Sequence, residues 1–349
     1  MFDLNKLKNN NFNKPYIIAE AGVNHENDID KAFEMIRSSS DNGADAIKFQ
    51  AYKAETLASK NSPAYWDTRE EQIESQFKLF KKFDKFWKKE FELLKLECDK
   101  NSIDFMCTPF DIESANFLND LCETIKISSS DLNNLPFIEH ICRFKKPIIL
   151  STGASTLDEI NSTVEIINKH DIECIILHCV LNYPTEDRNA NLMRIQTLKN
   201  YFTNNIIGYS DHTLPKEMNL LIHSWLLGAK VIEKHYTFNK KLKGNDHYHA
   251  MDSMDLNKFV NKINKIISII GDGKIDSGTN EAISRENARR SLVYNNNLTK
   301  GKAIDKNDIT FKRPGTGIPP DQYNKIIGKI MLKDVKKDDL LDWKDFNNE

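Results

Sequence analysis

The sequence lacks the features that would place it in several common classes of protein. No apolar run approaches the roughly 20 residues that cross a bilayer. The first 22 residues hold no signal-peptide apolar region before an A-x-A site. The formal net charge is only -2, with Lys interleaved among Asp and Glu. We therefore expect a protein without a membrane span and without nucleic acid as its main partner.

Nucleotide-binding and redox motifs are also missing. Neither G-x-x-x-x-G-K-[ST] nor G-x-G-x-x-G occurs, which argues against a nucleoside triphosphate or a dinucleotide as ligand. The chain has 6 cysteines and no C-x-x-C pair. Cys107, Cys174 and Cys179 lie inside apolar, strand-like runs. We interpret the cysteines as reduced core residues of a cytoplasmic protein, and a catalytic thiol has little support.

The chain does contain short runs rich in Ile, Val and Phe, separated by segments of helical periodicity. Ser155 is the expected N-cap of one such helix, and Gly271 is expected to end another. Alternation of this kind predicts a (β/α)8 TIM barrel, with an open doubly wound sheet as the alternative. The expected strands are 16–22, 46–50, 104–110, 124–130, 147–153, 174–180, 206–212 and 231–237.

Two regions depart from this alternation. The connection between residues 50 and 104 is too long for one helix and is rich in aromatic and charged residues. It predicts an extra helix and a loop over the barrel mouth. After Gly271 the pattern changes to short strands and turns. We therefore expect a barrel domain over 1–275, a linker over 276–288 and a small, mostly β domain over 289–349.

The predicted strands end in polar residues, although their bodies are apolar. Burying a polar group is costly unless it is paired with another group, a metal or a ligand. Because the carboxyl ends of barrel strands meet at one face, these residues predict a shared site. They are Glu20, Lys48, Gln50, Thr108, Lys126, Ser129, Ser151, Thr152, His178, Asn182, Tyr183, Ser210, Asp211, His212, Glu233 and His235.

Side-chain type suggests two functions within this site. His212 and His235 follow adjacent strands and are placed to bind one divalent ion. Lys48 and Lys126, surrounded by hydroxyl groups, predict a receptor for a small anion with several charges. A nearby segment, 244–252, adds His247 and His249. It is either a second set of ligands or a loop facing the substrate, and we favour the loop.

The chain resembles the sialic acid synthase family, the bacterial nonulosonate synthases, over nearly its whole length. The resemblance rests on the order and spacing of "IIAEAGVNHENDIDKAFEMI", "GADAIKFQ", "TPFD", "IKISSSDLNNLP", "PIILSTGAS", "LHCVLNYPT", "IGYSDHT", "GAKVIEKHYT" and "KRPGTGI". Each motif alone has little specificity, but their order and spacing together are highly specific for the family. The resemblance implies a TIM barrel followed by a C-terminal antifreeze-like (β-clip) domain.

The resemblance also implies a reaction. Phosphoenolpyruvate would condense with an open-chain N-acyl-mannosamine-type aldose, giving phosphate and a nine-carbon 2-keto acid such as N-acetylneuraminate. The implied catalytic residues are Glu20, Lys48, Lys126, His212 and His235, with manganese on the two histidines. The implied phosphoenolpyruvate ligands are Lys48, Thr108, Lys126, Ser129, Ser151, Asn182 and Ser210. The implied sugar ligands are Glu20, Gln50, Tyr183, Glu233, Asp246 and, from the partner in a domain-swapped homodimer, Arg313.

Some positions depart from the family pattern and leave alternatives open. Leu181 stands where family members carry Asn or Ser, so either Asn182 takes over that contact or the contact is lost. The acceptor is open between N-acetylmannosamine, a 2,4-diacetamido-6-deoxy sugar of the legionaminate or pseudaminate type, and a phosphorylated sugar. A metal-dependent TIM-barrel hydrolase is a further alternative, disfavoured because no H-x-H occurs on the first strand.

Overall fold

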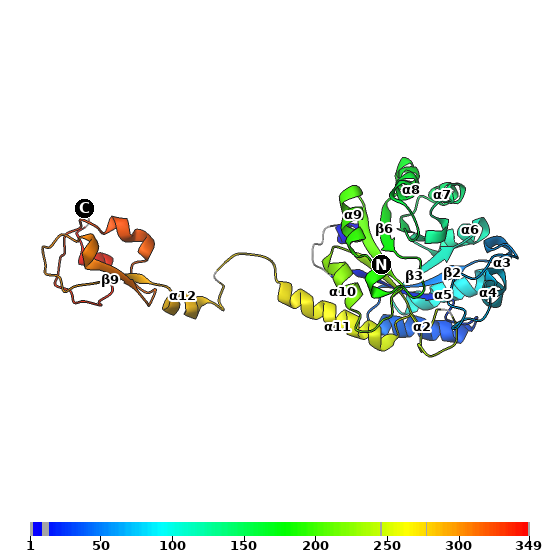
Figure 1. The fold of residues 1–349 in the computed structure, drawn as a ribbon, viewed down its shortest axis with the longest axis horizontal. Helices are drawn as coiled ribbons and strands as arrows, with labels where there is room; N and C mark the ends of the chain where they lie inside the picture. Colours follow the sequence, from blue (N-terminus) through cyan, green and yellow to red (C-terminus); the bar gives the residue numbers. More distant parts are fainter. Residues whose placement is uncertain (1–2, 9–13, 245, 277, 348–349) are drawn as a thin grey trace. The chain divides into compact units, whose positions relative to one another are not determined.

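The structure is a computed structural model that describes residues 3–8, 14–244, 246–276 and 278–347 (Figure 1). The chain divides into two compact units, Met1–Gly271 and Asp272–Glu349. Each unit has its own buried hydrophobic core.

The first unit is a barrel of eight parallel strands, which confirms the predicted fold and excludes the open doubly wound sheet. The order around the sheet is β3-β2-β1-β8-β7-β6-β5-β4, and the end strands β3 and β4 lie next to each other. The strands are β1 (Tyr16–Gly22), β2 (Ala46–Ala51), β3 (Asp104–Pro109), β4 (Ile125–Ile127), β5 (Ile148–Ser151), β6 (Cys174–Cys179), β7 (Ile206–Asp211) and β8 (Val231–His235).

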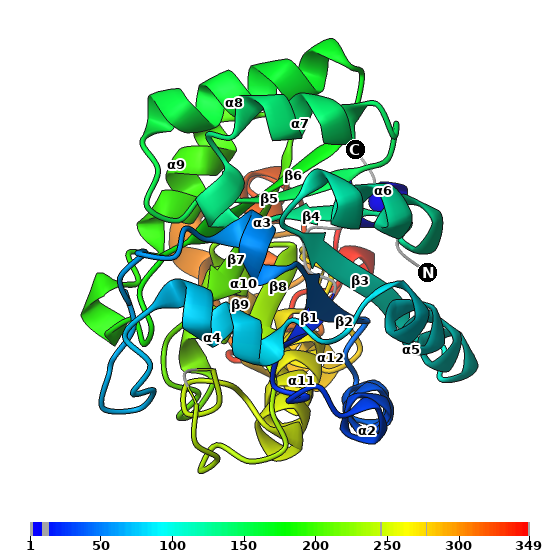
Figure 2. The same cartoon turned by 90° about the vertical axis from the view of Figure 1, so that its right-hand side faces the viewer.

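Helices surround the barrel, as Figure 2 shows. They are α2 (Ile29–Asp41), α5 (Lys88–Lys100), α6 (Ile112–Leu121), α7 (Leu135–Cys142), α8 (Leu157–Lys169), α9 (Met193–Tyr201), α10 (Asn219–Leu226) and α11 (Ser253–Ile270).

Gly271 ends α11 with a φ of 68°, as expected from the sequence. The prediction for the start of α8 was wrong by one residue. Thr156 caps this helix, because its hydroxyl accepts from the Glu159 amide while the Glu159 carboxylate accepts from the Thr156 amide; the Ser155 hydroxyl instead donates to the Gly153 carbonyl.

Alternate residues of each strand face the barrel axis or the helices. The part of the interior nearer the amino ends of the strands is apolar and includes Ile18, Leu177 and Val231. Gly208 completes this layer, since a Cβ there would lie 2.4 Å from Leu177 Cδ2 and 2.5 Å from the Val231 carbonyl. The short helix α1 (Leu4–Lys8) packs Leu4 against the same layer. The remaining interior positions, toward the carboxyl ends of the strands, are polar.

The connection between β2 and β3 contains two helices besides α5. They are α3 (Ala54–Leu57) and α4 (Gln76–Phe83), which lie in front of the barrel strands in Figure 2. Side chains of this connection and of the β8 strand line one cavity. The extra helix and the loop predicted over the barrel mouth are therefore present.

The second unit is small and built mainly from short β segments. Its strands β9 (Ser291–Tyr294) and β10 (Ile309–Lys312) pair antiparallel around a core that includes Leu292, Tyr294 and Ile326. Part of the predicted linker is helical: α12 (Ala282–Ala288) precedes β9, and the Glu286 carbonyl accepts from the Gly315 amide. Arg313 directly follows β10, and its side chain is exposed.

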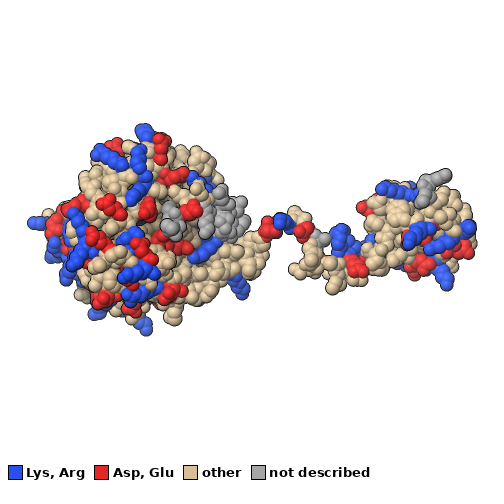
Figure 3. Space-filling view, turned by 180° about the vertical axis from the view of Figure 1, so that it is seen from behind, with Lys and Arg blue, Asp and Glu red and all other residues tan. Residues whose placement is uncertain are grey.

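The surface and the cysteines agree with the composition. Basic and acidic side chains are interspersed over the face of the barrel unit that Figure 3 shows. All six cysteines are buried and unbridged. Among the described residues, we find no helix that is both long and apolar enough to cross a membrane.

Candidate active site

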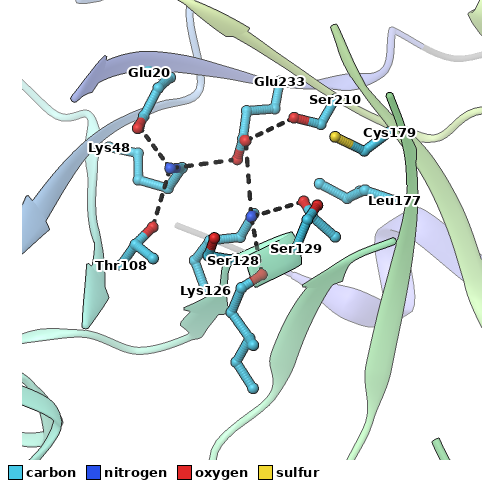
Figure 4. Close-up of polar contacts among 12 residues, drawn as sticks. Glu20, Lys48, Thr108, Lys126, Ser128, Ser129, Leu177, Cys179, Ser210 and Glu233 are labelled. Carbon is cyan, nitrogen blue, oxygen red and sulfur yellow. Dashed lines mark hydrogen bonds and ion pairs between the residues drawn. The ribbon is translucent and has the colours of Figure 1, made fainter. Parts of the chain in front are cut away.

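Two buried lysines stand at the centre of the barrel mouth, as Figure 4 shows. Lys48 comes from β2 and Lys126 from β4, and each is only 3% exposed. Lys48 Nζ lies 2.6 Å from Glu20 Oε2 and donates to Thr108 Oγ1 at 3.1 Å. Lys126 Nζ donates to Ser151 Oγ at 2.8 Å and to a β4 carbonyl at 3.1 Å. The predicted pair of cations with neighbouring hydroxyl groups is therefore assembled.

A carboxylate that the family resemblance implies as a sugar ligand, Glu233, lies between the two lysines. Glu233 Oε2 is 3.8 Å from Lys48 Nζ, and Glu233 Oε1 is 3.8 Å from Lys126 Nζ. Ser210 donates to Oε1 at 2.9 Å, whereas Oε2 accepts no hydrogen bond within the described part of the chain. With Glu20, the cluster holds two cations and two carboxylates. An incoming anion must therefore compete with these carboxylates for the lysines.

Burial and the neighbouring charges have opposing effects on the pKa values in this cluster. Burial raises the pKa of Glu20 even though Lys48 opposes the change. The pKa of Glu233 is lowered, because Lys126 and Lys48 together outweigh the effect of burial. Burial lowers the pKa of Lys126, whereas Glu20 and Glu233 outweigh burial at Lys48 and raise its pKa. Glu20 is therefore the carboxyl most ready to carry a proton.

Imidazole rings lie on the other side of the mouth. His212, which follows β7, has its ring centroid 5.3 Å from that of His235 on β8. The His212 Nδ1 atom lies 2.8 Å from the Val180 carbonyl oxygen, which can only accept, so Nδ1 carries the proton. The Nε2 atom of His212 then presents a lone pair suited to a metal ion. Burial lowers the pKa of His235 well below its ordinary value, and His249 and His212 add to the effect, which keeps this ring neutral.

The segment after β8 brings two more groups to His235. Ligand atoms of His235, Asp246 and His249 all lie within 4.8 Å of one another, and this is the one such group of three among the described residues. His247 has a different place: its Nδ1 lies 2.8 Å from Thr237 Oγ1, and its Nε2 lies 4.0 Å from Glu26 Oε1. His247 therefore anchors the loop at the border of the cavity, whereas the buried ring of His249 lies against that of His235.

A cavity of about 300 Å³ opens next to these groups. Its polar side includes Gln50, His235 and Asp246, and Gln50 also donates to Glu20 at 2.8 Å. Its apolar side is formed by Tyr52, Leu57, Tyr65, Trp66, Leu79, Phe80, Phe83 and Phe110. A larger surface hollow, of about 970 Å³, lies at the opposite end of the strands, near Glu173 and Lys230. Because barrel enzymes place their chemistry at the carboxyl ends, we assign the active site to the smaller cavity.

Comparison with known proteins agrees with this geometry. Residues 35–275 match the NeuB family, and residues 289–347 match the SAF domain. The chain belongs to the NeuB family. An N,N'-diacetyllegionaminic acid synthase of Campylobacter jejuni is 36% identical, over 94% of this chain and 99% of the relative. A second protein of that name, from Legionella pneumophila, is 34% identical over 94% of this chain and 93% of the relative.

A solved structure supports the same assignment. The N-acetylneuraminic acid (sialic acid) synthetase from Leptospira borgpetersenii, in complex with citrate, is 37% identical and superposes with a TM-score of 0.69. The match covers 78% of this chain and 90% of that one. The chain is thus an enzyme of a family whose relatives are named as synthases of nonulosonic acids.

Most of the residues predicted from the sequence meet in this NeuB-family site. The structure brings together Glu20, Lys48, Gln50, Thr108, Lys126, Ser129, Ser151, Tyr183, Ser210, His212, Glu233, His235 and Asp246. Ser129 borders it through Oγ, which accepts from the Gly153 amide at 2.9 Å. The ring of Tyr183 lies against that of His212, with 4.2 Å between centroids.

Other predicted residues lie elsewhere. Asn182 is not brought to the site: its side chain is exposed, and Leu181 lines the cavity instead. His178 faces the helices from an outward position of β6. Asp211 on β7 also points away from the site, as its alternation with Ser210 and His212 predicts. Arg313 belongs to the second unit.

Two parts of the site were missed. Cys179 faces the interior, with Sγ 3.8 Å from His212 Nδ1. Strand alternation from Leu177 would have found it. The aromatic wall, meaning the apolar side of the cavity described above, was predicted only as an extra helix and a loop over the barrel mouth. No residue pattern indicates which rings of a long loop turn inward.

Proposed function

We propose that this enzyme condenses phosphoenolpyruvate with the open-chain aldehyde of an N-acyl amino sugar. A bond forms between C3 of phosphoenolpyruvate and the aldehyde carbon, water adds at C2, and the bond from C2 to the phosphate oxygen breaks. One proton of that water ends on the new hydroxyl group, and the other leaves with phosphate. The product is a nine-carbon 2-keto sugar acid.

The observation that carries this proposal is the pair of buried ammonium groups. Phosphoenolpyruvate has a carboxylate and a phosphate a few bonds apart, which suits two cations flanked by hydroxyl donors. Thr108 Oγ1 accepts from Lys48 Nζ at 3.1 Å and Ser151 Oγ accepts from Lys126 Nζ at 2.8 Å, so each hydroxyl group keeps its own proton to donate to the anion. Ser210 and Ser129 border the same space.

Glu20 gives the cluster a way to accept this anion. Its raised pKa means that a proton is readily taken up when a further negative charge arrives. Protonated Glu20 no longer pairs electrostatically with Lys48, so the lysine becomes available to the anion. Gln50 remains bonded to Glu20 Oε1 and holds the carboxyl group in place. Glu20 would then exchange its proton near the reacting carbons.

The donor atoms on the other side of the mouth fit a divalent metal ion. His212 offers Nε2, His235 is neutral, and Asp246 Oδ2 lies 3.9 Å from His235 Nδ1. Two imidazoles with a carboxylate suit a borderline ion such as manganese. When bound, such an ion polarises an aldehyde oxygen as a Lewis acid. The ring of Tyr183 packs against that of His212.

The cavity favours an acceptor with apolar substituents and no phosphate. Its aromatic wall suits methyl groups, and no Lys or Arg is among the described residues that line it. A 2,4-diacetamido-6-deoxy aldose carries three methyl groups and no charge. Two relatives, at 36% and 34% identity, are named as synthases of diacetyllegionaminic acid. We therefore propose this acceptor class ahead of N-acetylmannosamine and its phosphate.

Phosphate release measures the reaction directly. The full-length enzyme would be given phosphoenolpyruvate with 2,4-diacetamido-2,4,6-trideoxymannose, N-acetylmannosamine or N-acetylmannosamine 6-phosphate, with and without Mn²⁺. We expect kcat/KM for the first to exceed the second by about tenfold to 100-fold, as contacts of two or three methyl groups provide. Product mass would confirm a nine-carbon acid. Phosphate release that depends on none of these aldoses would contradict the proposal.

We also propose that Arg313 reaches the acceptor from the partner subunit of a homodimer. Support comes from its exposed side chain and from the family resemblance. Arg313→Ala and Lys126→Met would each be inactive alone. Co-expressed, the two variants form heterodimers with one intact composite site, so activity returns in part. A site built within one subunit would leave the mixture inactive.

A further inference from the structure

The segment that carries His249 returns to the strand that carries His235. The Met251 amide donates to the His235 carbonyl at 2.7 Å, and the Thr237 amide donates to the Met251 carbonyl at 2.9 Å. These two bonds close a loop over residues 238–250 at the carboxyl end of β8. Because His249 lies two residues before Met251, its position against β8 is fixed by backbone pairing.

The side chain of His249 is fully buried at this point. Its exposed fraction is 0%, and its ring centroid lies 4.8 Å from that of His235 and 6.3 Å from that of His212. Tyr183 borders the same ring at 5.5 Å between centroids. Three imidazoles therefore share one small region next to a carboxylate. A cation bound through the ring nitrogens accounts for this gathering of buried imidazoles beside a carboxylate.

The spacing is close to what one ion requires. Metal bonds to imidazole nitrogen and carboxylate oxygen are about 2.0–2.2 Å long, so donors on one ion lie at most about 4.2 Å apart. The ligand atoms of His235, Asp246 and His249 lie within 4.8 Å of one another. Side-chain rotations that move these atoms by roughly 1 Å or less close the set on an ion.

We propose that His249, with His235 and Asp246, forms a 2-His-1-carboxylate set for the divalent ion, beside His212. The inference rests on the proposed function for the presence of an ion and goes beyond it by adding His249 to the donors named there. A further imidazole strengthens binding and favours Fe²⁺ and Co²⁺ over Mn²⁺. The cavity lined by His235 and Asp246 lies beside these donors.

Metal binding, measured without either substrate, tests this assignment. Metal-free full-length protein would be titrated with Co²⁺, following visible absorption, and with Mn²⁺, following the electron paramagnetic resonance of the free ion. We expect His249→Ala and His249→Gln to weaken Co²⁺ binding by about tenfold to 100-fold and to change the Co²⁺ spectrum. Co²⁺ should also bind the wild-type protein more tightly than Mn²⁺ does.

His247→Gln is the matched control, since His247 lies in the same loop and bonds to Thr237. It should leave the Co²⁺ affinity within about twofold and the spectrum unchanged. His249 variants that bind Co²⁺ like the wild-type protein would overturn the assignment. Thermal denaturation of the metal-free variants separates ligand loss from misfolding, and the Gln variant preserves most of the side-chain volume if the Ala variant fails to fold. The metal titration does not measure turnover, so it tests the ligand assignment separately from the reaction. If the wild-type protein binds metal as expected but releases no phosphate in the assay of the proposed function, that result would contradict the proposed function and leave the ligand assignment unaffected.

Discussion

Strand β8 carries buried charges on both of its faces, and its outward charge pairs with a carboxylate of β7. Toward the barrel axis, Glu233 lies 3.8 Å from each of two lysines, and its Oε2 atom accepts no hydrogen bond within the residues described. Toward the helices, Lys234 lies 2.6 Å from Asp211 Oδ2 and donates to the Thr213 carbonyl at 2.6 Å. One residue along a strand separates these two environments.

In the outer pair, both carboxylate oxygens of Asp211 accept hydrogen bonds, whereas in the inner cluster Glu233 Oε2 accepts none from the described residues. Asp211 also accepts from the Tyr209 hydroxyl at 2.8 Å and from the amide and hydroxyl of Thr213 at 3.1 Å and 3.0 Å. Lys234 lowers the pKa of Asp211 despite the opposing effect of burial. A saturated network holds one arrangement, whereas long ion pairs exchange readily for a ligand. Completeness of pairing thus distinguishes structural charge from functional charge on the same strands.

The largest effect is expected from Lys126→Met, on the inner face. This change removes one of two cations that bind phosphoenolpyruvate, and we expect kcat/KM for phosphate release to fall by about 10⁴-fold, or about 5 kcal/mol. The folded state should lose little stability, because Glu233 keeps its bond from Ser210 and burial already disfavours the charge on Lys126. Turnover close to that of the wild-type enzyme would remove Lys126 from the anion site.

Lys234→Met makes the same substitution on the outer face and should have the opposite outcome. It leaves Asp211 buried without its cation, which costs about 3–5 kcal/mol in the free energy of unfolding. Urea denaturation followed by fluorescence would measure this loss, since three of the four tryptophans lie in the barrel unit. The pH dependence has a definite sign: stabilisation by Asp211 is present above the pKa of an unfolded aspartate and is lost as pH falls through its lowered pKa.

Asp211→Asn combined with Lys234→Met is the control for this pair. Removing both charges should recover part of the loss, because neither ion then remains buried alone. A single Lys234→Met variant as stable as the wild-type protein would show that the outer pair does not hold the strands together. The contrast between the two faces would then fail.

The sequence predicted the barrel and the members of its polar mouth because both follow from local patterns. Apolar runs separated by helical periodicity give the eight strands, and alternation along each strand gives the inward positions, such as Ser210 and Glu233. Alternation does not give distances across a barrel. The position of Glu233 between Lys48 and Lys126 was therefore not predicted, and its role as a sugar ligand stays a prediction.

The sequence was least informative where a strand has ended. Asn182 follows β6 in an irregular segment, so no periodicity indicates its direction, and its side chain turns out to be exposed. The same applies to the loop of His249, whose position depends on the backbone pairing of Met251 with β8. The aromatic wall depends on how α3 and α4 pack over the mouth, which is a tertiary property.

The smallest expected effect concerns Glu20 and sharpens the description of the inner face. Because its pKa is raised, Glu20 is protonated at low pH and competes with the substrate for Lys48 only after losing its proton. Phosphoenolpyruvate binding, measured by calorimetry without acceptor, should weaken about tenfold as pH rises through that raised pKa. Glu20→Gln should abolish this weakening while keeping the Gln50 contact. The titration of the ligand's own phosphate affects both proteins equally, so only the difference between their profiles is assigned to Glu20. Identical profiles would mean that Lys48 binds the anion without displacing Glu20, and the inner ion pair would then be as permanent as the outer one.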